Sequence, residues 1–162
     1  MKILDVIELN KVHLDRLSNQ SGSNGEALAV EKYDDMIPRP RGKKLSNLLD
    51  VLAETGIEIK KTSFDALACP DGLDLGNLES IRNLIDQIVF IEIKTTKRKN
   101  VTDNFTGYYF GLTESEIDAS KVLGDRHKVL LFNLNNRNTL FTSVPEILDR
   151  AKSQTWQVSV QI

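Results

Sequence analysis

The chain has 162 residues, 40% of them hydrophobic, which suffices for one core but not for two ordinary domains, so we expect a single domain over 1–162. A single cysteine, Cys69, excludes an internal disulfide and is expected to pack in the core, while two distant histidines, His13 and His127, cannot build a zinc site. The formal charge of −2 argues weakly against nucleic-acid binding, but lysines and arginines gather in short clusters that give locally positive surface.

The N-terminal part is predicted to hold one helix and a basic connection. Residues 1–20 fit a short strand or a helix equally well, and because they contain no long apolar run we expect a cytoplasmic protein without a membrane span. Ser23-x-x-Glu26 has the form of a capping box, which predicts a helix over about 24–35. Two prolines cannot continue this helix, so residues 37–42 are expected to be an exposed connection.

The middle of the chain alternates between helical and strand patterns. Leucines recur at helical spacing before Gly56, which is suited to end a helix. Short apolar runs between turn residues are typical of strands, and IVFIEIKTT is the clearest of them. In chain order we predict a helix over 45–55, strands over 57–61 and 64–69, a turn-rich and partly helical segment over 71–87, and a strand over 88–96.

The C-terminal part is predicted to add helices and a hairpin. Thr113 is expected to cap a helix, with Glu116 completing a capping box and Gly124 ending the helix. HKVLLFNL is a strongly apolar strand, and the turn NNRN after it favours a hairpin. The predicted elements are a strand at 108–110, a helix at 114–124, paired strands at 127–134 and 139–142, a helix at 143–152 and a closing strand at 156–162.

Two charged residues stand at the polar end of the clearest strand. Because residues two apart in a strand face the same side, Glu92 and Lys94 project together, following the apolar Ile88 and Phe90 on that face. The strand therefore passes from a packed interior into a polar end. That end is where we expect a functional site.

A third charged residue joins them if the strand over 64–69 pairs antiparallel with this strand. One register then matches polarity at every pair, and it brings two carboxylates and a lysine to one rim of the sheet. The pairs in this register are Asp65 with Glu92, Leu67 with Phe90, and Cys69 with Ile88.

Two carboxylates and an amine in one small space suit the hydrolysis of a phosphodiester bond. The carboxylate oxygens of Asp65 and Glu92 are ligands that Mg²⁺ prefers, and Mn²⁺ is expected to substitute for it. The metal would lower the pKa of a bound water, while Lys94 would orient that water or donate to the transition state. Glu26 is a candidate for a further metal ligand, although a capping-box glutamate also serves to begin a helix.

Four pieces of the chain resemble the PD-(D/E)xK nucleases, which include restriction endonucleases and archaeal-type Holliday-junction resolvases. The similarity covers about residues 22–134. It implies a restriction-endonuclease-like α/β fold, in which helices flank a central mixed sheet, and divalent-metal-dependent hydrolysis. It also implies an active triad of Asp65, Glu92 and Lys94, with Glu26 as the helix acid. The pieces, in the family's order, are Gly22-Ser23-x-x-Glu26, Gly56, Phe64-Asp65 and Ile91-Glu92-Ile93-Lys94-Thr95-Thr96.

The resemblance has one departure. The acid that precedes the Glu-x-Lys pair follows Phe64 rather than proline, whereas a literal Pro-Asp occurs at Pro70-Asp71. We prefer Asp65, because Asp71 lies beyond the strand and is expected to mark a turn.

Basic residues near the predicted site are candidates for contacts with DNA, which we expect as the substrate in preference to RNA. A solvated turn explains each basic cluster equally well. Cutting both strands of a duplex needs two sites, so a homodimer is expected on geometric grounds. The candidate contact residues are Lys97, Arg98, Lys99, Arg39, Arg41 and Lys43.

Two simpler interpretations compete with the nuclease hypothesis. A Glu-x-Lys pair on a strand is common by chance as a solvated edge pair. The same fold also serves as a non-catalytic module that binds nucleic acid or a protein partner. The upstream acid at a matching register, the two threonines after Lys94 and the helix acid Glu26 favour the nuclease.

Overall fold

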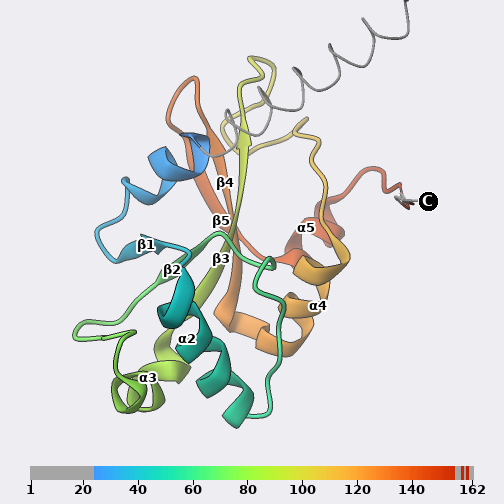
Figure 1. The fold of residues 1–162 in the computed structure, drawn as a ribbon. Helices are drawn as coiled ribbons and strands as arrows, with labels where there is room; N and C mark the ends of the chain where they lie inside the picture. The colour runs from blue at the N-terminus through green and yellow to red at the C-terminus, as the bar shows by residue number, and fades with distance from the viewer. Residues whose placement is uncertain (1–23, 156–157, 159, 161–162) are drawn as a thin grey trace, which may run out of the picture.

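Five strands form a mixed sheet in the computed structural model, which describes residues 24–155, 158 and 160 (Figure 1). In the sheet they lie in chain order: β1 (Met36–Pro38), β2 (Ala66–Ala68), β3 (Val89–Thr96), β4 (His127–Asn133) and β5 (Thr139–Thr142). Neighbouring strands are antiparallel except for β3 and β4, which are parallel. A parallel pair needs a crossover, and a loop with helix α4 (Glu114–Leu123) supplies it.

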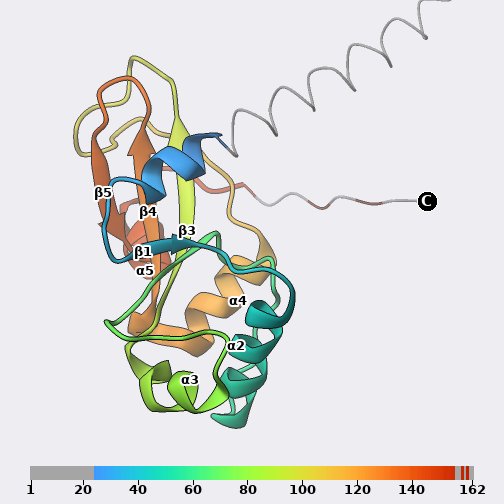
Figure 2. The same ribbon diagram turned by 60° about the vertical axis from the view of Figure 1, so that its left-hand side comes forward.

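Helices cover both faces of this sheet. Besides α4 they are the helical residues 24–30, α2 (Gly42–Glu54), α3 (Leu78–Leu84), α5 (Val144–Arg150) and the 3-10 turns η1 (Ile85–Gln87) and η2 (Gly124–Arg126). The helical residues 24–30 pack against Ile91 and Ile93 of β3. Helices α2, α3 and α4 pack on the other face around Phe90, and Figure 2 shows them gathered toward one end of the sheet.

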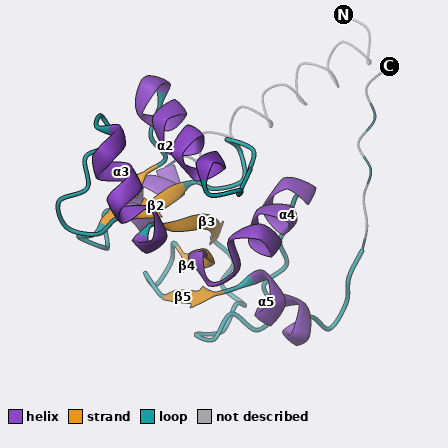
Figure 3. Cartoon of the chain, turned by 90° about the horizontal axis from the view of Figure 1, so that it is seen from below, coloured by secondary structure: helices purple, strands orange, loops and turns teal. Residues whose placement is uncertain are grey.

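A third apolar cluster lies over β4 and β5. It joins Val129 and Leu131 of β4 to Val144 of α5 and to Val101 and Phe105 of the loop that follows β3. Figure 3 shows α4 and α5 beside these two strands. The loop after β3 is therefore part of the packed structure rather than a free extension.

Local sequence patterns explain most of these elements. In α2, Leu48, Val51 and Leu52 recur on one stripe and are buried, as the leucine spacing predicted. Helix α4 begins with the capping box predicted for it, and the predicted hairpin is present as β4 and β5. The expected α/β class, a single mixed sheet flanked by helices, is confirmed for the described residues. The restriction-endonuclease-like version of that fold stays a prediction.

Two predictions for the N-terminal part are wrong in their extent. The first helix covers 24–30 rather than 24–35, because residues 31–35 form turns that lead into a strand. That strand, β1, includes the first two residues of the predicted connection over 37–42. Its proline, Pro38, is tolerated because β1 lies at the edge of the sheet, where one side of the strand needs no hydrogen-bond donors.

Two predicted strands are absent, and the one over 64–69 is shortened to β2. Residues 57–61 form no strand, because both sides of β2 are already paired with β1 and β3. Residues 108–110 are also irregular. The rings of Tyr108 and Phe110 pack together at 4.9 Å between centroids, and the Tyr108 hydroxyl donates to the carbonyl oxygen of Thr95 over 2.6 Å. Tyr108 and Phe110 therefore pack against their neighbours from an irregular segment rather than from a strand.

The remaining predictions concern the chain ends. The strand or helix expected within residues 1–20 lies outside the described residues, and so does most of the strand expected at 156–162. Val158 and Val160, which are described, are exposed and belong to no strand. Among the described residues, no helix is long and apolar enough to cross a bilayer.

Candidate active site

Asp65 lies at the rim of the sheet, one residue before β2. The predicted register is confirmed, since β2 and β3 pair antiparallel with the expected partners. The backbone N–H of Asp65 donates to the carbonyl oxygen of Ile91 over 2.8 Å, and the Asp65 carboxylate Oδ2 accepts from the N–H of Ile93 over 3.0 Å. Asp65 is therefore bonded to the residues on either side of Glu92.

Lys94 is the cation at the centre of the cluster. Its ammonium Nζ lies 2.8 Å from Glu92 Oε1 and 3.1 Å from Glu116 Oε2. Both carboxylates are buried, with exposed fractions of 4% for Glu92 and 5% for Glu116. Hydrogen bonds between charged groups are short and strong, so the ammonium group is held between β3 and the start of α4.

Glu116 is the residue that sequence reasoning missed as a member of this site. The sequence predicts only a capping role, and that role is present: Glu116 Oε2 accepts from the N–H of Thr113 over 2.9 Å. The same oxygen also accepts from Lys94. Because the two residues are 22 positions apart, no local motif links them. The capping box itself was the available signal, since it predicts a glutamate fixed at the start of a helix.

The environment of the Glu92 carboxyl group disfavours its charged form. Burial raises its pKa, the charge of Asp65 raises it further, and Lys94 opposes both effects. Its second oxygen, Oε2, is buried and has no hydrogen-bond partner among the described residues. An orphaned buried oxygen is costly, because it lacks the hydrogen-bond donor or cation that would offset its desolvation.

Glu26 reaches the same neighbourhood from the helix on the other face. Burial and the charge of Asp65 raise the pKa of the Glu26 carboxyl. The helix lies very close to β3, since a Cβ added to Gly25 would be 2.9 Å from the Cγ2 atom of Thr95. Glycine at this position therefore permits the approach that brings Glu26 toward Asp65. The capping box that would also employ Glu26 involves Ser23, which lies outside the described residues.

Arg39 is a second cation beside Asp65. Its backbone N–H donates to the carbonyl oxygen of Asp65 over 2.7 Å. Its guanidinium Nη1 donates to the carbonyl oxygens of Phe64 and Lys61 over 3.0 and 3.2 Å. The half-buried Arg39 side chain is therefore fixed near the acidic cluster, and its charge opposes the rise in the pKa of Glu26.

The donor set at this rim fits a divalent metal ion that keeps part of its water shell. Within the described residues, no group of three or more His, Cys, Asp and Glu side chains is close enough to hold a metal by itself. Mg²⁺ does not need such a group, because it commonly takes one or two carboxylates, several waters and substrate phosphate oxygens. The orphaned Glu92 oxygen and the excess of acids over cations suit such an ion. The acids are Glu26, Asp65, Glu92 and Glu116, and the cations are Arg39 and Lys94.

The other predicted DNA contacts are exposed. Arg41 and Lys43 lie at the start of α2, where no side chain caps the helix and no acidic residue occupies the first turn. Lys97, Arg98 and Lys99 follow the end of β3 directly. The structure thus places Arg39 at the acidic cluster itself and the other five basic residues on the surface.

The basic loop after β3 is fastened to the β4–β5 turn. The side-chain amide of Asn135 donates to the carbonyl oxygen of Lys97 over 2.6 Å. The side-chain amide of Asn138 donates to the carbonyl oxygen of Asp103 over 3.0 Å. Two asparagines of one turn therefore fix the backbone of the loop that carries three predicted phosphate contacts.

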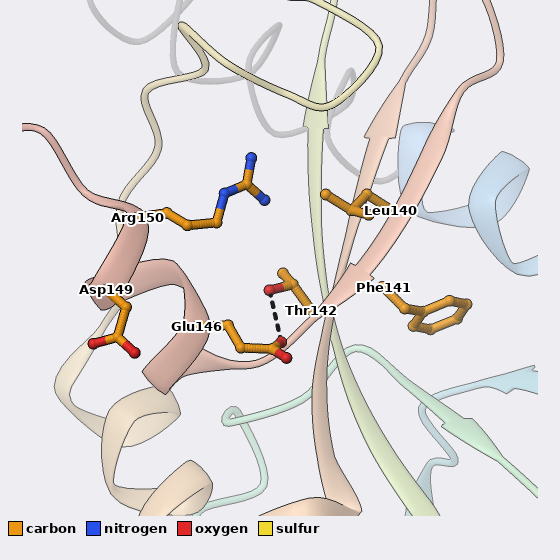
Figure 4. Close-up of a pocket in the computed structure, with 6 residues that line it drawn as sticks. All are labelled: Leu140, Phe141, Thr142, Glu146, Asp149 and Arg150. Atoms are coloured by element: carbon orange, nitrogen blue, oxygen red, sulfur yellow. Dashed lines mark hydrogen bonds between the residues drawn. The ribbon is translucent and has the colours of Figure 1, made fainter.

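A separate pocket lies between β5 and α5 (Figure 4). There Glu146 caps α5 and accepts from the Thr142 hydroxyl over 3.0 Å, which Figure 4 marks with a dashed line. None of the predicted catalytic side chains lines this pocket. Its six lining residues are Leu140, Phe141, Thr142, Glu146, Asp149 and Arg150.

The cluster at the sheet rim is thus the part of the described chain where reactive side chains lie closest together in a suitable arrangement. It joins Asp65, Glu92 and Lys94, as the sequence predicted, and adds Glu116 and Arg39 as close neighbours. Its carboxylates suit cation binding and its ammonium group suits anion binding. Comparison with protein-family models, curated proteins and solved structures finds no match to this chain, so the PD-(D/E)xK resemblance stays a prediction.

Proposed function

We propose that this protein is a metal-dependent DNA endonuclease that hydrolyses a phosphodiester bond at Asp65, Glu92 and Lys94. The observation that carries the proposal is their arrangement at one rim of the sheet. The Asp65 carboxylate is bonded to the residue next to Glu92, and the Lys94 ammonium lies 2.8 Å from the Glu92 carboxylate. Two oxygen donors with an adjacent ammonium group match the needs of phosphodiester hydrolysis.

Each side chain has its own role in this proposal. Asp65 and Glu92 would hold one Mg²⁺ ion, and the orphaned Oε2 of Glu92 is the oxygen available for it. When bound, the ion lowers the pKa of a coordinated water and offsets charge on the phosphate. Lys94 would donate a hydrogen bond to a phosphate oxygen that gains negative charge in the transition state. Glu26 is the candidate for a third acidic ligand.

DNA is the proposed substrate because basic residues border the acidic rim. Arg39 is bonded through its backbone to Asp65, and its charge acts on Glu26, so it is the candidate for a contact with the phosphate under attack. Lysines and arginines at an uncapped helix start, as at Arg41 and Lys43, are electrostatically unfavourable unless an anion is nearby. A single rim site acts on one strand at a time, so we keep a homodimer as the proposed form for cutting a duplex.

One observation favours a second candidate function, a non-catalytic module that binds nucleic acid or a protein partner. Lys94 already pairs with two buried carboxylates, which is also how an ion-pair network inside a structural domain looks. In that case Lys94 fixes α4 to β3 and takes no part in a reaction.

Cleavage of DNA with and without metal separates the two functions. The full chain is incubated with supercoiled plasmid and with four-way-junction DNA in Mg²⁺, in Mn²⁺ and in EDTA. We expect cleavage with either metal and none in EDTA. Cutting at fixed plasmid sequences would indicate restriction-type specificity, and cutting at junctions alone would indicate a resolvase.

Two lysines, one at the proposed site and one on the surface, give matched variants for this experiment. We expect Lys94→Ala to lower kcat by roughly a hundredfold or more, the usual contribution of a group that acts in proton transfer or transition-state stabilisation. Lys121→Ala is the control, because Lys121 is exposed and pairs only with its helix neighbour Asp118 among the described residues. Inertness of the wild type on every substrate and metal would overturn the nuclease proposal in favour of the binding module.

A further inference from the structure

Glu116 contacts Lys94 in a way that capping alone does not require. A capping box needs the glutamate to accept from the backbone N–H of the N-cap residue, here Thr113. The same Oε2 atom also lies 3.1 Å from the Lys94 ammonium. The Glu116 side chain is 5% exposed, far more buried than a surface cap needs to be.

We propose that Glu116 is a positioning residue, which keeps the Lys94 ammonium aimed at the reacting phosphate when the charge of the Glu92 carboxylate is shared with a metal ion. This proposal rests on the nuclease function proposed above. Glu116 itself touches neither substrate nor metal in it. Its effect on the reaction passes entirely through Lys94.

Lys94 needs a second carboxylate partner in this proposal, because its first partner, Glu92, is also a proposed metal ligand. Among the described residues, Lys94 has two carboxylate partners, Glu92 at 2.8 Å and Glu116 at 3.1 Å. A carboxylate that binds a divalent cation donates electron density to it and attracts an ammonium group less strongly. Glu116 then remains as the one carboxylate in contact with Lys94 that is not a proposed metal ligand.

The start of α4 holds Glu116 in a fixed position. Its carboxylate accepts from the N–H of Thr113, and its own N–H donates to the Thr113 hydroxyl over 3.3 Å. These reciprocal bonds restrict the Glu116 side chain before it meets Lys94. A long, otherwise flexible lysine side chain is thereby fixed at its charged end, which reduces the entropy lost on reaching the transition state.

The chain offers a matched control in the second capping box. Glu146 caps α5 through Ser143 with the same reciprocal geometry, and its carboxylate also accepts from a hydroxyl group (Figure 4). Glutamine is compatible with a capping box. The substitutions Glu116→Gln and Glu146→Gln therefore both keep a helix cap, but only the first removes a negative charge from Lys94.

The first readout is steady-state cleavage with saturating Mg²⁺. We expect Glu116→Gln to lower kcat by roughly ten- to a hundredfold with little change in KM, because the lost interaction acts in the transition state. Glu146→Gln is expected to leave both constants unchanged. Equal kcat and KM values for wild type, Glu116→Gln and Glu146→Gln would overturn the proposal.

The second readout needs neither activity nor metal. In ¹⁵N-labelled protein near neutral pH, exchange with water broadens the NMR signals of exposed lysine ammonium groups, whereas burial and ion pairing slow this exchange and make the signal observable. We expect a Lys94 ammonium signal, identified by its absence in Lys94→Met, in the wild type and in Glu146→Gln, and its loss or broadening in Glu116→Gln. A signal that persists unchanged in Glu116→Gln would show that Glu116 does not hold Lys94, and would overturn the proposal.

The two readouts distinguish failure of this inference from failure of the proposed function. A wild type that cuts no DNA, with a Lys94 signal lost only in Glu116→Gln, would overturn the nuclease function and support the Lys94–Glu116 contact. If the wild type is active and Glu116→Gln changes neither kcat nor the Lys94 signal, the positioning role is overturned and the nuclease function remains.

Discussion

Two neighbouring residues of β3 are buried equally but differ in chemistry. Glu92 and Ile93 each have an exposed fraction of 4%, and they project to opposite faces of the sheet. Ile93 packs in an apolar cluster under the helical residues 24–30. Glu92 faces Asp65 and Lys94, and one of its carboxylate oxygens has no hydrogen-bond partner in the part of the chain that the structure describes.

The difference between the faces separates a residue whose burial stabilises the fold from a residue whose burial costs free energy. Burial of an isoleucine stabilises a fold, whereas burial of a carboxylate costs free energy that pairing only partly offsets. Packing explains the Ile93 face completely. It does not explain the burial of Glu92, which the proposed metal-binding role would explain.

The largest effect is expected on the polar face, from Asp65→Asn. Asparagine keeps an oxygen that accepts from the N–H of Ile93, so the local structure should survive, while the charge proposed to hold the metal is lost. We expect kcat to fall by roughly a hundredfold or more, measured as plasmid cleavage in Mg²⁺.

Asp71→Asn is the control for this prediction. Asp71 is the acid of the literal Pro-Asp pair and lies exposed in the turn beyond β2. It should be replaceable without loss of cleavage. If Asp71→Asn abolished cleavage and Asp65→Asn did not, the choice between the two acids made from the sequence would be reversed.

The next effect is expected on the apolar face, from Gly25→Ala. The new Cβ would lie 2.9 Å from Thr95 Cγ2, so the helical residues 24–30 must shift away from β3. Overpacking of this kind costs about 1–3 kcal/mol, more than the helix propensity gained from alanine. Urea denaturation should show the loss in the free energy of unfolding.

Two variants test the cause of that loss. Gly111→Ala should be neutral, because a Cβ there meets nothing within 4 Å. Thr95→Ala should partly restore the stability of Gly25→Ala, since it removes the atoms that clash. Additive effects of Gly25→Ala and Thr95→Ala would show that the two residues do not interact.

The smallest effect is a pH dependence that comes from His127, which is fully buried at the start of β4. Burial lowers its pKa from 6.5, although Ser63 and Glu116 oppose this. Below about pH 6.5 the unfolded chain therefore binds more protons than the native protein, so the free energy of unfolding falls as the pH falls.

A variant that lacks His127 isolates this contribution. Between about pH 7.5 and about pH 5.5, we expect Tm to decrease more in the wild type than in His127→Gln, by the equivalent of at most about 1.4 kcal/mol per pH unit. Circular dichroism melts at the two pH values provide the measurement. An identical decrease in both proteins would assign the pH dependence to other groups.

The sequence predicted the part of the site that depends on alternation along a strand. Because side chains alternate between faces, Glu92 and Lys94 had to share one, and matching polarity across a strand pair then selected the register that brings Asp65 to them. Apolar spacing and a capping box likewise predicted α2 and α4. These signals are local, and local physics was sufficient for them.

The features that the sequence did not predict depend on distant parts of the chain. The contact between Glu116 and Lys94 needs the crossover from β3 to β4 to bring α4 over the sheet. Residues 57–61 alternate like a strand but have no free edge of β2 to join. In both cases the result depends on which distant elements lie alongside the segment. A short stretch of sequence does not reveal this.

The asparagine contacts between the β4–β5 turn and the loop after β3 bear on the proposed binding of DNA at Lys97 to Lys99. A backbone held by these hydrogen bonds has few conformations to lose. Binding of a phosphate chain to this loop would therefore cost little conformational entropy. A free arm would have to be ordered by its ligand. If Lys97 to Lys99 bind DNA as proposed, the rate of association would depend on encounter rather than on the folding of a loop.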